Sequence, residues 1–502
     1  MGKRTFVRRT ALKYFRQTLA ASLVSIASTF LLALPCNADD RPNIVVFLCD
    51  DLGYGDLQCY GHPHIKTPNI DKLAKDGIRF TDFYSAAPVC SPSRVGLLTG
   101  RSPNRAGVYD WIPPAGKPRP DAREQVHMQR DEITIPAILQ KAGYATCMAG
   151  KWHCNSRFNE PDAQPQPNDF GFEHWLGTQN NAAPSHENPT NFVRNGKPVG
   201  KVDSFSCQYV VDEAIDWMSN QAKTNAEQPL FIYIPFHEPH EPVASPQNLV
   251  DQYRESARNN DEAQFFANVA NVDLAVGRLL KSLDELKLTA NTLVIFTADN
   301  GPETLNRYRG AQRSYGRPGK LRGMKLHTHE AGFRVAGIMR WPERITVGQV
   351  VSTPVSSLDF LPTFCDLAGA ELPQRKLDGA NFLPALSGRP IERGQPLFWS
   401  YFNAINEARV AMRDGEWKVL ARLNGGNLPK FENITTQRRE LILQAELTDL
   451  EIYNIASDVS EETNLADQQP ELAARMKEKL QRLYQELHEN SVVWKPAVID
   501  GN

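Results

Sequence analysis

The chain has 502 residues, of which 41% are apolar and 23% are charged, and this ordinary globular composition excludes a largely disordered protein. Its net charge of −2 excludes the strongly basic balance that is typical of nucleic-acid-binding proteins. A chain of this length can bury a large core, so we expect one large domain and one smaller domain.

Residues 1–38 are predicted to form a signal peptide. Six basic residues and no acidic residue precede an apolar run from Leu19 to Leu34, and the small residue Ala38 suits cleavage. Because the run is short for a transmembrane helix, we expect an exported protein, periplasmic or secreted, with no stable membrane anchor. The pair Arg8-Arg9 leaves ordinary secretion and twin-arginine export both open. The mature chain then has 50 basic and 58 acidic residues, a net charge of −8, so we expect no nucleic-acid partner.

Four short apolar runs predict strands that are buried on both faces, as in a parallel sheet. They span residues 44–49, 145–149, 230–234 and 292–298, with helices predicted between them at 67–74, 133–142, 209–221 and 262–288. Their ends carry, in chain order, Asp50-Asp51, Lys151 and His153, His237 and His240, and Asp299-Asn300. This repeated order predicts a doubly wound α/β sheet with a site along one edge. Adjacent carboxylates at that edge favour calcium or magnesium.

A helix is predicted to begin at or just after Cys90. Pro92 suits a first helical turn, and the backbone N–H groups at a helix N-terminus attract an anion. With Arg94 one turn further on, the segment indicates chemistry on a charged oxyacid. A cysteine taken alone is more often a buried structural thiol.

Eight cysteines are present, one of them (Cys36) in the predicted signal peptide. If Cys90 is used chemically, six remain that could form disulfide bridges in an oxidising compartment. Their spacing is not that of a zinc site, and the sequence does not give a pairing. The six are Cys49, Cys59, Cys147, Cys154, Cys207 and Cys365.

The second half of the chain changes in character near residue 390. The basic stretch 303–322 is either a solvated face or a surface that steers a polyanion. Further on, Asp414-Gly415 between two apolar runs predicts a β-hairpin, and residues 450–453 and 471–488 predict a strand and a helix. We therefore predict a catalytic α/β domain over 39–389 and a smaller α+β domain over 390–502.

Several motifs together resemble those of the type I, formylglycine-dependent sulfatases and are similar to the arylsulfatase and N-acetylgalactosamine-6-sulfatase branch. They are Cys90-Ser91-Pro92-Ser93-Arg94 with Gly100-Arg101, the stretch 143–153, the stretch 50–56, Asp299-Asn300-Gly301 and the tail motif 461–466. The resemblance covers nearly the whole mature chain. It implies an alkaline-phosphatase-like fold, with a large, mostly parallel sheet between helices.

The resemblance also implies a cofactor and a modified residue. A formylglycine-generating enzyme reads Cys-x-Pro-x-Arg and would convert Cys90 to formylglycine (3-oxoalanine), whose hydrated aldehyde is the nucleophile. Calcium, with magnesium less favoured, would be held by one oxygen of residue 90 and four further side chains. These are Asp50, Asp51, Asp299 and Asn300.

The catalytic roles implied by the resemblance fall on five further residues. Arg94 would stabilise the hydrated aldehyde, and Lys151 and Lys325 would hold the sulfate oxygens. Lys325 and His240 would assist departure of the alcohol, and His153 would take the proton whose removal expels sulfate. The neighbouring residue His237 competes for the acid role, and we favour His240 because it lies in Pro-His-x-Pro.

Two departures from the family pattern stand out, Glu330-Ala331-Gly332 for Glu-Gly-Gly and Cys154-Asn155 for Leu-Gly. The predicted substrate is a sulfated carbohydrate. Two alternatives are a phosphoester or phosphonate hydrolase of the same superfamily and a non-enzymatic protein that binds sulfated polysaccharide through residues 307–322. The sugar, the sulfate position, endo or exo action and the oligomeric state stay open. Candidate pocket residues are Asn180, Asn181, His186, Arg307 and Arg309.

Overall fold

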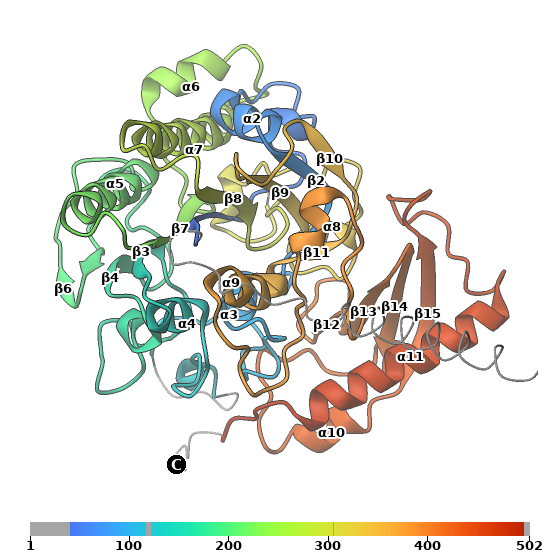
Figure 1. The fold of residues 1–502 in the computed structure, drawn as a ribbon. Helices are drawn as coiled ribbons and strands as arrows, with labels where there is room; N and C mark the ends of the chain where they lie inside the picture. Colours follow the sequence, from blue (N-terminus) through green and yellow to red (C-terminus); the bar gives the residue numbers. More distant parts are fainter. Residues whose placement is uncertain (1–40, 117–121, 305, 496–502) are drawn as a thin grey trace, which may run out of the picture. The chain divides into compact units, whose positions relative to one another are not determined.

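The computed structural model describes residues 41–116, 122–304 and 306–495. The described residues from Pro42 onward form one compact unit, shown in Figure 1. The predicted signal peptide lies outside the described residues. Among the helices that the structure describes, none is long and apolar enough to cross a lipid bilayer.

The large sheet has four adjacent parallel strands at its centre, in the order β8 (Thr292–Ala298), β1 (Asn43–Asp50), β7 (Leu230–Pro239) and β3 (Ala145–Lys151). These strands contain the four predicted apolar runs, and their side chains are almost all buried. Because the strands are parallel, all four carboxyl ends meet at one edge of the sheet. This arrangement confirms the predicted α/β architecture.

Further strands extend the sheet on both sides, and antiparallel pairs on each side make it mixed. β9 (Arg334–Arg340) is antiparallel to both β8 and β2 (Ile78–Tyr84), and it was not predicted. Beyond β2 lie the parallel strands β10 (Gln349–Val351) and β11 (Val355–Ser356). On the other side β3 pairs with β4 (His174–Thr178), which is followed by the short antiparallel strands β5 (Val193–Arg194) and β6 (Lys197–Pro198).

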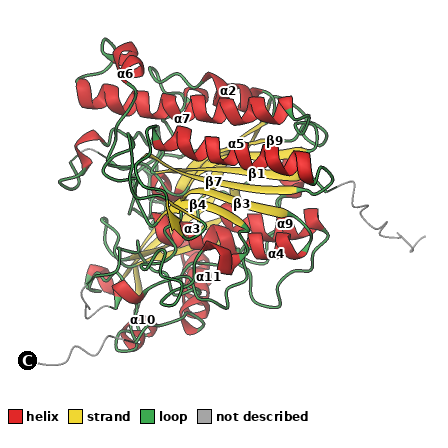
Figure 2. Cartoon of the chain, turned by 90° about the vertical axis from the view of Figure 1, so that its left-hand side faces the viewer, coloured by secondary structure: helices red, strands yellow, loops and turns green. Residues whose placement is uncertain are grey.

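Helices cover both faces of the large sheet, as Figure 2 shows. One layer holds α2 (Pro68–Lys75), α5 (Ser206–Thr224), α6 (Gln247–Tyr253) and α7 (Asn260–Glu285), and the other holds α3 (Cys90–Thr99), α4 (Ile135–Lys141) and α9 (Phe360–Ala368). The long helix α7 begins where the Asn259 side chain accepts a hydrogen bond from the Glu262 amide. A one-turn helix, α8 (Glu330–Phe333), precedes β9. The layers therefore bury the sheet between helices, as expected.

A separate four-stranded antiparallel sheet follows, in the order β12 (Leu397–Tyr401), β13 (Arg409–Asp414), β14 (Trp417–Leu423) and β15 (Leu447–Asn454). The predicted hairpin is β13–β14, but its two-residue turn is Gly415-Glu416, and Gly415 has the positive φ of 61° that such a turn needs. The amphipathic helix α11 (Pro470–Glu489) packs on this sheet beside α10 (Arg439–Leu443). The domain boundary at residues 389/390 stays a prediction.

The seven described cysteines are all free, and six of them are buried. Disulfide bridges, which the sequence left possible, are therefore absent among the described residues. Cys49, Cys147 and Cys207 lie in the core, where they pack as small apolar side chains.

Candidate active site

The parallel order of β8, β1, β7 and β3 brings the predicted site residues to one edge. Asp299 follows β8, Asp50 ends β1, His240 follows β7 and Lys151 ends β3. Two residues at these strand ends, Asp51 and His153, adopt positive φ angles of 64° and 53°. Backbone strain of this kind is uncommon outside glycine and clusters at functional sites.

Three carboxylates form the centre of the site. Oxygens of Asp50, Asp51 and Asp299 lie within 4.8 Å of one another, and all three residues are buried. Three cations surround them. Arg94 Nε donates to Asp299 Oδ2 at 2.8 Å, Lys325 Nζ donates to Asp51 Oδ2 at 2.7 Å, and Lys151 Nζ donates to Asp50 Oδ2. Each of the three buried carboxylates is therefore paired with a cation, which offsets the cost of burying its charge.

The pKa values of two of the carboxylates, Asp50 and Asp299, are shifted in opposite directions. Burial alone would raise the pKa of Asp50, but the nearby charges of Lys151, His240 and Arg94 hold it well below its usual range. The pKa of Asp299 rises to about 7, first because it is buried and then because Asp50 lies beside it. A cation bound between these two carboxylates would relieve their repulsion.

The donor set fits a hard divalent cation. Asp50 Oδ1 and Asn300 Oδ1 are buried and have no hydrogen-bond partner, although Asn300 Nδ2 donates to Asp51 Oδ1 at 2.8 Å. Carboxylate and amide oxygens are the ligands that calcium and magnesium prefer. The side chains of Asp50, Asp51, Asp299 and Asn300 therefore lie together, and two of their oxygens are free to bind a cation.

Cys90 is the first residue of α3, as the sequence predicts. The helix is buried along its whole length, and Cys90 itself is 3% exposed. Burial raises the pKa of its thiol to about 11, more than the nearby cations Lys151 and Lys325 lower it. As an unmodified thiol, Cys90 therefore stays protonated at neutral pH and is a poor nucleophile.

A cavity of about 420 Å³ opens onto Cys90, and His153, His240 and Lys325 line it. His153 Nε2 lies 3.0 Å from the Ile112 carbonyl oxygen, while its buried Nδ1 has no partner. Burial, followed by the charge of Lys151, holds the pKa of His153 well below its ordinary value. Nε2 then carries the proton, because only an N–H can donate to a carbonyl, and Nδ1 is available as a base.

His240 and His237 have different surroundings. His240 Nδ1 lies 2.7 Å from the Glu241 carbonyl oxygen, and its Nε2 lies 3.5 Å from Asp51 Oδ2. His237 is instead paired with the Thr178 hydroxyl, at 2.8 Å, and it is not among the residues that line the cavity. The geometry therefore favours His240 for an acid–base role.

The pocket predictions are correct in part. Asn180, Asn181 and Arg307 line the cavity, whereas His186 and Arg309 do not. His186 is fully buried behind the site, where its Nδ1 pairs with the Asn268 amide at 3.1 Å. Seven further lining residues were not predicted, and two of them come from the C-terminal region. They are Val89, Asp110, Trp111, Tyr308, Leu326, Asn403 and Glu432.

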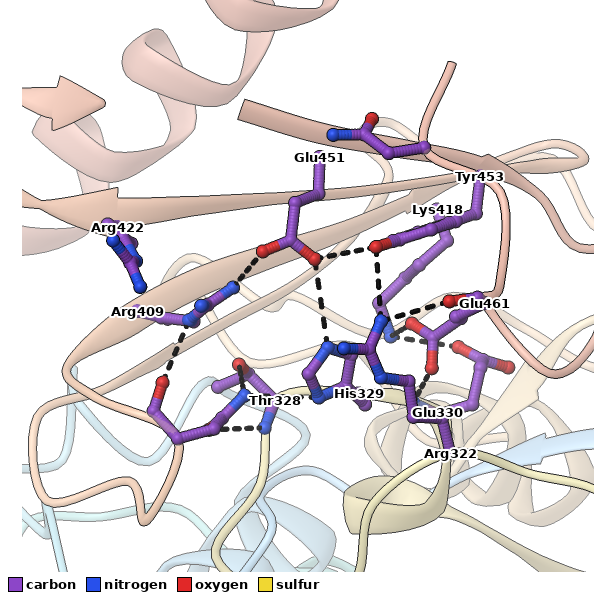
Figure 3. Close-up of polar contacts among 12 residues, drawn as sticks. Arg322, Thr328, His329, Glu330, Arg409, Lys418, Arg422, Glu451, Tyr453 and Glu461 are labelled. Atoms are coloured by element: carbon purple, nitrogen blue, oxygen red, sulfur yellow. Dashed lines mark hydrogen bonds and ion pairs between the residues drawn. The ribbon is translucent and has the colours of Figure 1, made fainter. Parts of the chain in front are cut away.

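Lys325 lies between Arg322 and Glu330, and Figure 3 shows the polar contacts of these two residues with the C-terminal region. Lys418 Nζ on β14 donates to Glu330 Oε1 at 2.8 Å, and Glu461 Oε2 accepts from the Glu330 amide at 2.8 Å. Arg322 Nη1 donates to the Glu461 carbonyl oxygen at 2.9 Å. We call Glu330, Lys418 and Glu461 the buried charge cluster. The segment is thus tied to the C-terminal region on both sides of Lys325.

Glu330 and its neighbours also pack against the backbone of Asn300, one of the candidate metal ligands. The Gly301 amide donates to the Gly332 carbonyl oxygen at 3.0 Å, so the α8 turn lies directly on the Asn300-Gly301 backbone. A side chain at Gly301 would place its Cβ 1.6 Å from the Ala331 carbonyl oxygen, so this close approach requires glycine. Glu330-Ala331-Gly332 therefore lies behind the site and shapes it.

Comparison with known proteins gives a consistent result. The family model described as Sulfatase matches residues 42–370, and a second model, N-sulphoglucosamine sulphohydrolase, C-terminal, matches residues 324–486. Human arylsulfatase A is 36% identical over 420 residues, which cover 79% of this chain and 77% of the relative. Pig N-acetylgalactosamine-6-sulfatase is 34% identical, covering 76% and 72%. The crystal structure of Ps i-CgsB in complex with k-i-k-neocarrahexaose superposes with a TM-score of 0.75 at 27% identity, covering 92% of this chain and 96% of that one.

Proposed function

The chain belongs to the sulfatase family and is a sulfuric ester hydrolase, and from this premise we propose that it removes sulfate from carbohydrates through a formylglycine made from Cys90. The observation that carries the proposal is the position of Cys90. It lies in the wall of a cavity that His153, His240 and Lys325 also line. The names of two relatives support a carbohydrate substrate, since one is an N-acetylgalactosamine-6-sulfatase and the other is complexed with a neocarrahexaose.

We further propose that Asp50, Asp51, Asp299, Asn300 and the oxidised side chain of residue 90 hold calcium, with magnesium less favoured. When bound, the cation supplies positive charge that stabilises anionic oxygens and lowers the pKa of a hydroxyl beside it. The hydrated aldehyde at position 90 supplies the attacking hydroxyl and a second hydroxyl for the later step. Asp50 Oδ1 and Asn300 Oδ1 are buried without a hydrogen-bond partner, which supports this assignment.

The cations of the site bind and orient the sulfate group. Lys151 and Lys325 each reach one carboxylate with Nζ, and ammonium groups have further N–H donors for sulfate oxygens. Burial would lower the pKa of Lys325, but Asp51 holds it well above its usual range, so the ammonium stays charged. Arg94 bridges Asp299 and the Lys151 carbonyl oxygen, at 2.8 Å each, and so fixes two strand ends beside Cys90.

The two histidines divide the proton transfers. His240 lines the cavity, and its Nε2 carries a proton only in the imidazolium form, because Nδ1 donates to the Glu241 carbonyl oxygen. Burial lowers the pKa of His240, so the charged Lys325 ammonium protonates the departing alcohol oxygen, and His240 assists when it is protonated. His153 Nδ1, unpartnered and neutral, accepts the proton from the remaining hydroxyl of residue 90. Removal of that proton expels sulfate by cleavage of the C–O bond and restores the aldehyde, so no water needs to attack sulfur in this second step.

Two measurements test the proposal. Mass spectrometry of the peptide that spans Cys90 should find an aldehyde in place of the thiol, provided that a formylglycine-generating enzyme is present during expression. Sulfate release from 4-nitrophenyl sulfate should exceed phosphate release from 4-nitrophenyl phosphate, and Cys90→Ala should abolish it. An unmodified thiol in an active preparation would overturn the mechanism. A larger phosphate rate would favour the alternative of a phosphoester or phosphonate hydrolase, for which a phosphonate monoester hydrolase at 18% identity shows only a shared fold.

We also propose export to the periplasm or the medium, on the basis of residues 1–38. The non-enzymatic alternative finds little support, because arginines of the basic stretch 303–322 are used internally. Arg307 pairs with Glu303, and Arg313 donates to Asp261 at 2.8 Å. Expression with and without the first 38 residues, followed by activity assays on cell fractions, tests the export proposal.

A further inference from the structure

Trp111 is an exposed aromatic side chain on the wall of the cavity. It keeps 36% of its surface exposed, although it belongs to a segment that is otherwise buried. The guanidinium of Arg123 lies over one face of the indole, 4.3 Å from the ring centroid. An exposed indole that is held in one position on a cavity wall is a candidate contact for a ligand.

Buried polar groups hold Trp111 in place. Asp110 Oδ1 accepts from the Trp111 amide at 2.8 Å and from the Tyr401 hydroxyl at 2.8 Å. Asn403 Nδ2 donates to Asp110 Oδ2 at 2.9 Å, and Arg123 Nε donates to the Trp111 carbonyl oxygen at 3.1 Å. Asp110 and Arg123 are each only 3% exposed. The indole is therefore pre-organised, so a ligand would pay little ordering entropy to bind it.

This wall of the cavity carries excess negative charge. Arg123 is paired with both Asp110, at 3.5 Å, and Glu432, so one guanidinium faces two carboxylates. Glu432 and Asp110 both line the cavity. The cations that would hold the sulfate, Lys151 and Lys325, lie instead close enough to Cys90 to lower the pKa of its thiol. Arg307, which also lines the cavity, is paired with Glu303. A second anionic group placed against Trp111 would be repelled.

We propose that Trp111, with Asp110, Arg123 and Glu432 around it (together the Trp111 platform), stacks on the sugar unit next to the sulfated one, and that this neighbouring unit is uncharged. The apolar C–H face of a pyranose ring packs on the indole, whose π-face is electron-rich. The side-chain carbonyl oxygens of Asn180 and Asn181 are buried, line the cavity and have no partner, so they can accept from sugar hydroxyls. The inference rests on the proposed carbohydrate function and narrows it to substrates with a neutral neighbouring unit.

The experiment uses matched pairs of singly sulfated disaccharides that differ only in the neighbouring unit, galactose or glucuronate. Wild-type protein should prefer the galactose member of each pair that it cleaves. Trp111→Ala should raise KM for that member about tenfold, more than it changes kcat, and Trp111→Phe should recover most of the loss. Glu432→Gln should shift the preference toward the glucuronate member by about fivefold, because it removes one repelling charge.

Leu441→Ala is the matched control, because Leu441 is similarly exposed, at 40%, but lies on α10 and does not line the cavity. Thermal unfolding of each variant checks that it is folded. Two results would refute the platform and leave the carbohydrate function standing, provided that the wild-type protein cleaves the disaccharides. One is a KM in Trp111→Ala within about twofold of the wild-type value, and the other is a wild-type preference for the glucuronate member. If it cleaves 4-nitrophenyl sulfate but no disaccharide of the panel, the carbohydrate function itself fails, and the platform fails with it.

Discussion

Replacing Lys418 by methionine tests whether the buried charge cluster holds the molecule together. Lys418 is fully buried on β14, with Nζ 2.8 Å from Glu330 Oε1 and 3.8 Å from Glu461 Oε1. Its ammonium also lies 4.1 Å from the centroid of the Phe333 ring. Methionine keeps most of the unbranched, apolar length of lysine, so the substitution removes mainly the charge.

The expected magnitude follows from the charges that are left behind. Removing one partner of a buried ion pair costs about 3–5 kcal/mol, because the remaining charge stays buried. Glu330 would keep Arg334 Nη1 at 3.0 Å, whereas Glu461, which is ionised above its raised pKa of about 8, would lose its nearest cation, so the full cost appears above pH 8. Since a domain is stable by only about 5–15 kcal/mol, the loss is a large part of the total.

A compensating substitution separates charge from packing. Burial, more than the neighbouring Glu330, raises the pKa of Glu461 to about 8, while Lys418 lowers it. The uncharged variant Glu461→Gln keeps an oxygen that can accept from the Glu330 amide. Lys418→Met/Glu461→Gln should therefore be more stable than the sum of the single effects predicts, by about 0.5–3 kcal/mol in a double-mutant cycle.

Urea unfolding at pH 9, where Glu461 is ionised, followed by tryptophan fluorescence gives the free energy of unfolding for each variant. The control is Lys479→Met, which breaks the partly exposed pair with Asp414 in the same region and should cost less than about 1 kcal/mol. Loss of less than about 1 kcal/mol in Lys418→Met, or strict additivity in the double variant, would refute the reasoning. Because the cluster holds the segment of Lys325, sulfatase kcat should fall together with stability.

Three further outcomes are expected. His153→Ala should lower kcat by about 10²–10⁴. In the wild-type pH–rate profile, the loss of activity on the acidic side should lie well below pH 7, because burial and then the charge of Lys151 lower the pKa of His153. Loss of activity that begins at pH 7 or above contradicts this. Chelation should abolish turnover and lower Tm, and calcium should restore both, with a stabilisation of about 2.7 kcal/mol at 100 times Kd; an unchanged Tm would count against the metal site. The raised pKa of Glu461 means that the folded state binds the extra proton between pH 4.5 and about 8, so stability should fall as pH rises through that window. Urea midpoints across this range should show a smaller slope in Glu461→Gln, and an identical slope would exclude Glu461 as its source.

The central strands could be predicted because burial on both faces leaves a continuous apolar run in the sequence. The runs at 44–49 and 292–298 match β1 and β8 to within one residue. β7 continues to Pro239, five residues past its apolar run, because its polar end is also buried. β9 was missed, since its antiparallel pairing with β8 and β2 depends on partners far away in the sequence.

The site was predictable to the extent that it lies at strand ends. Parallel strands of one sheet bring their carboxyl ends together, so Asp50, Lys151 and Asp299 could be expected to meet. Asp110 and Asn403 could not, because they are joined by a hydrogen bond across 293 positions in the chain. His186 was misplaced for the same reason, since only the tertiary packing turns it away from the cavity toward Asn268.

The predicted boundary at residues 389/390 divides groups that depend on each other. Glu330 loses Lys418 if the chain stops at 389, and Asp110 loses both Tyr401 and Asn403. The ring of Phe333, which stacks on Trp399 at 4.1 Å, would be uncovered as well. Each buried polar group left without a partner costs about 1–3 kcal/mol, and charged groups cost more, so these losses rival the whole stability of a domain. A fragment of residues 42–389 should therefore lack both a cooperative urea transition and turnover of 4-nitrophenyl sulfate, and a fragment that shows both would prove the first 389 residues self-sufficient.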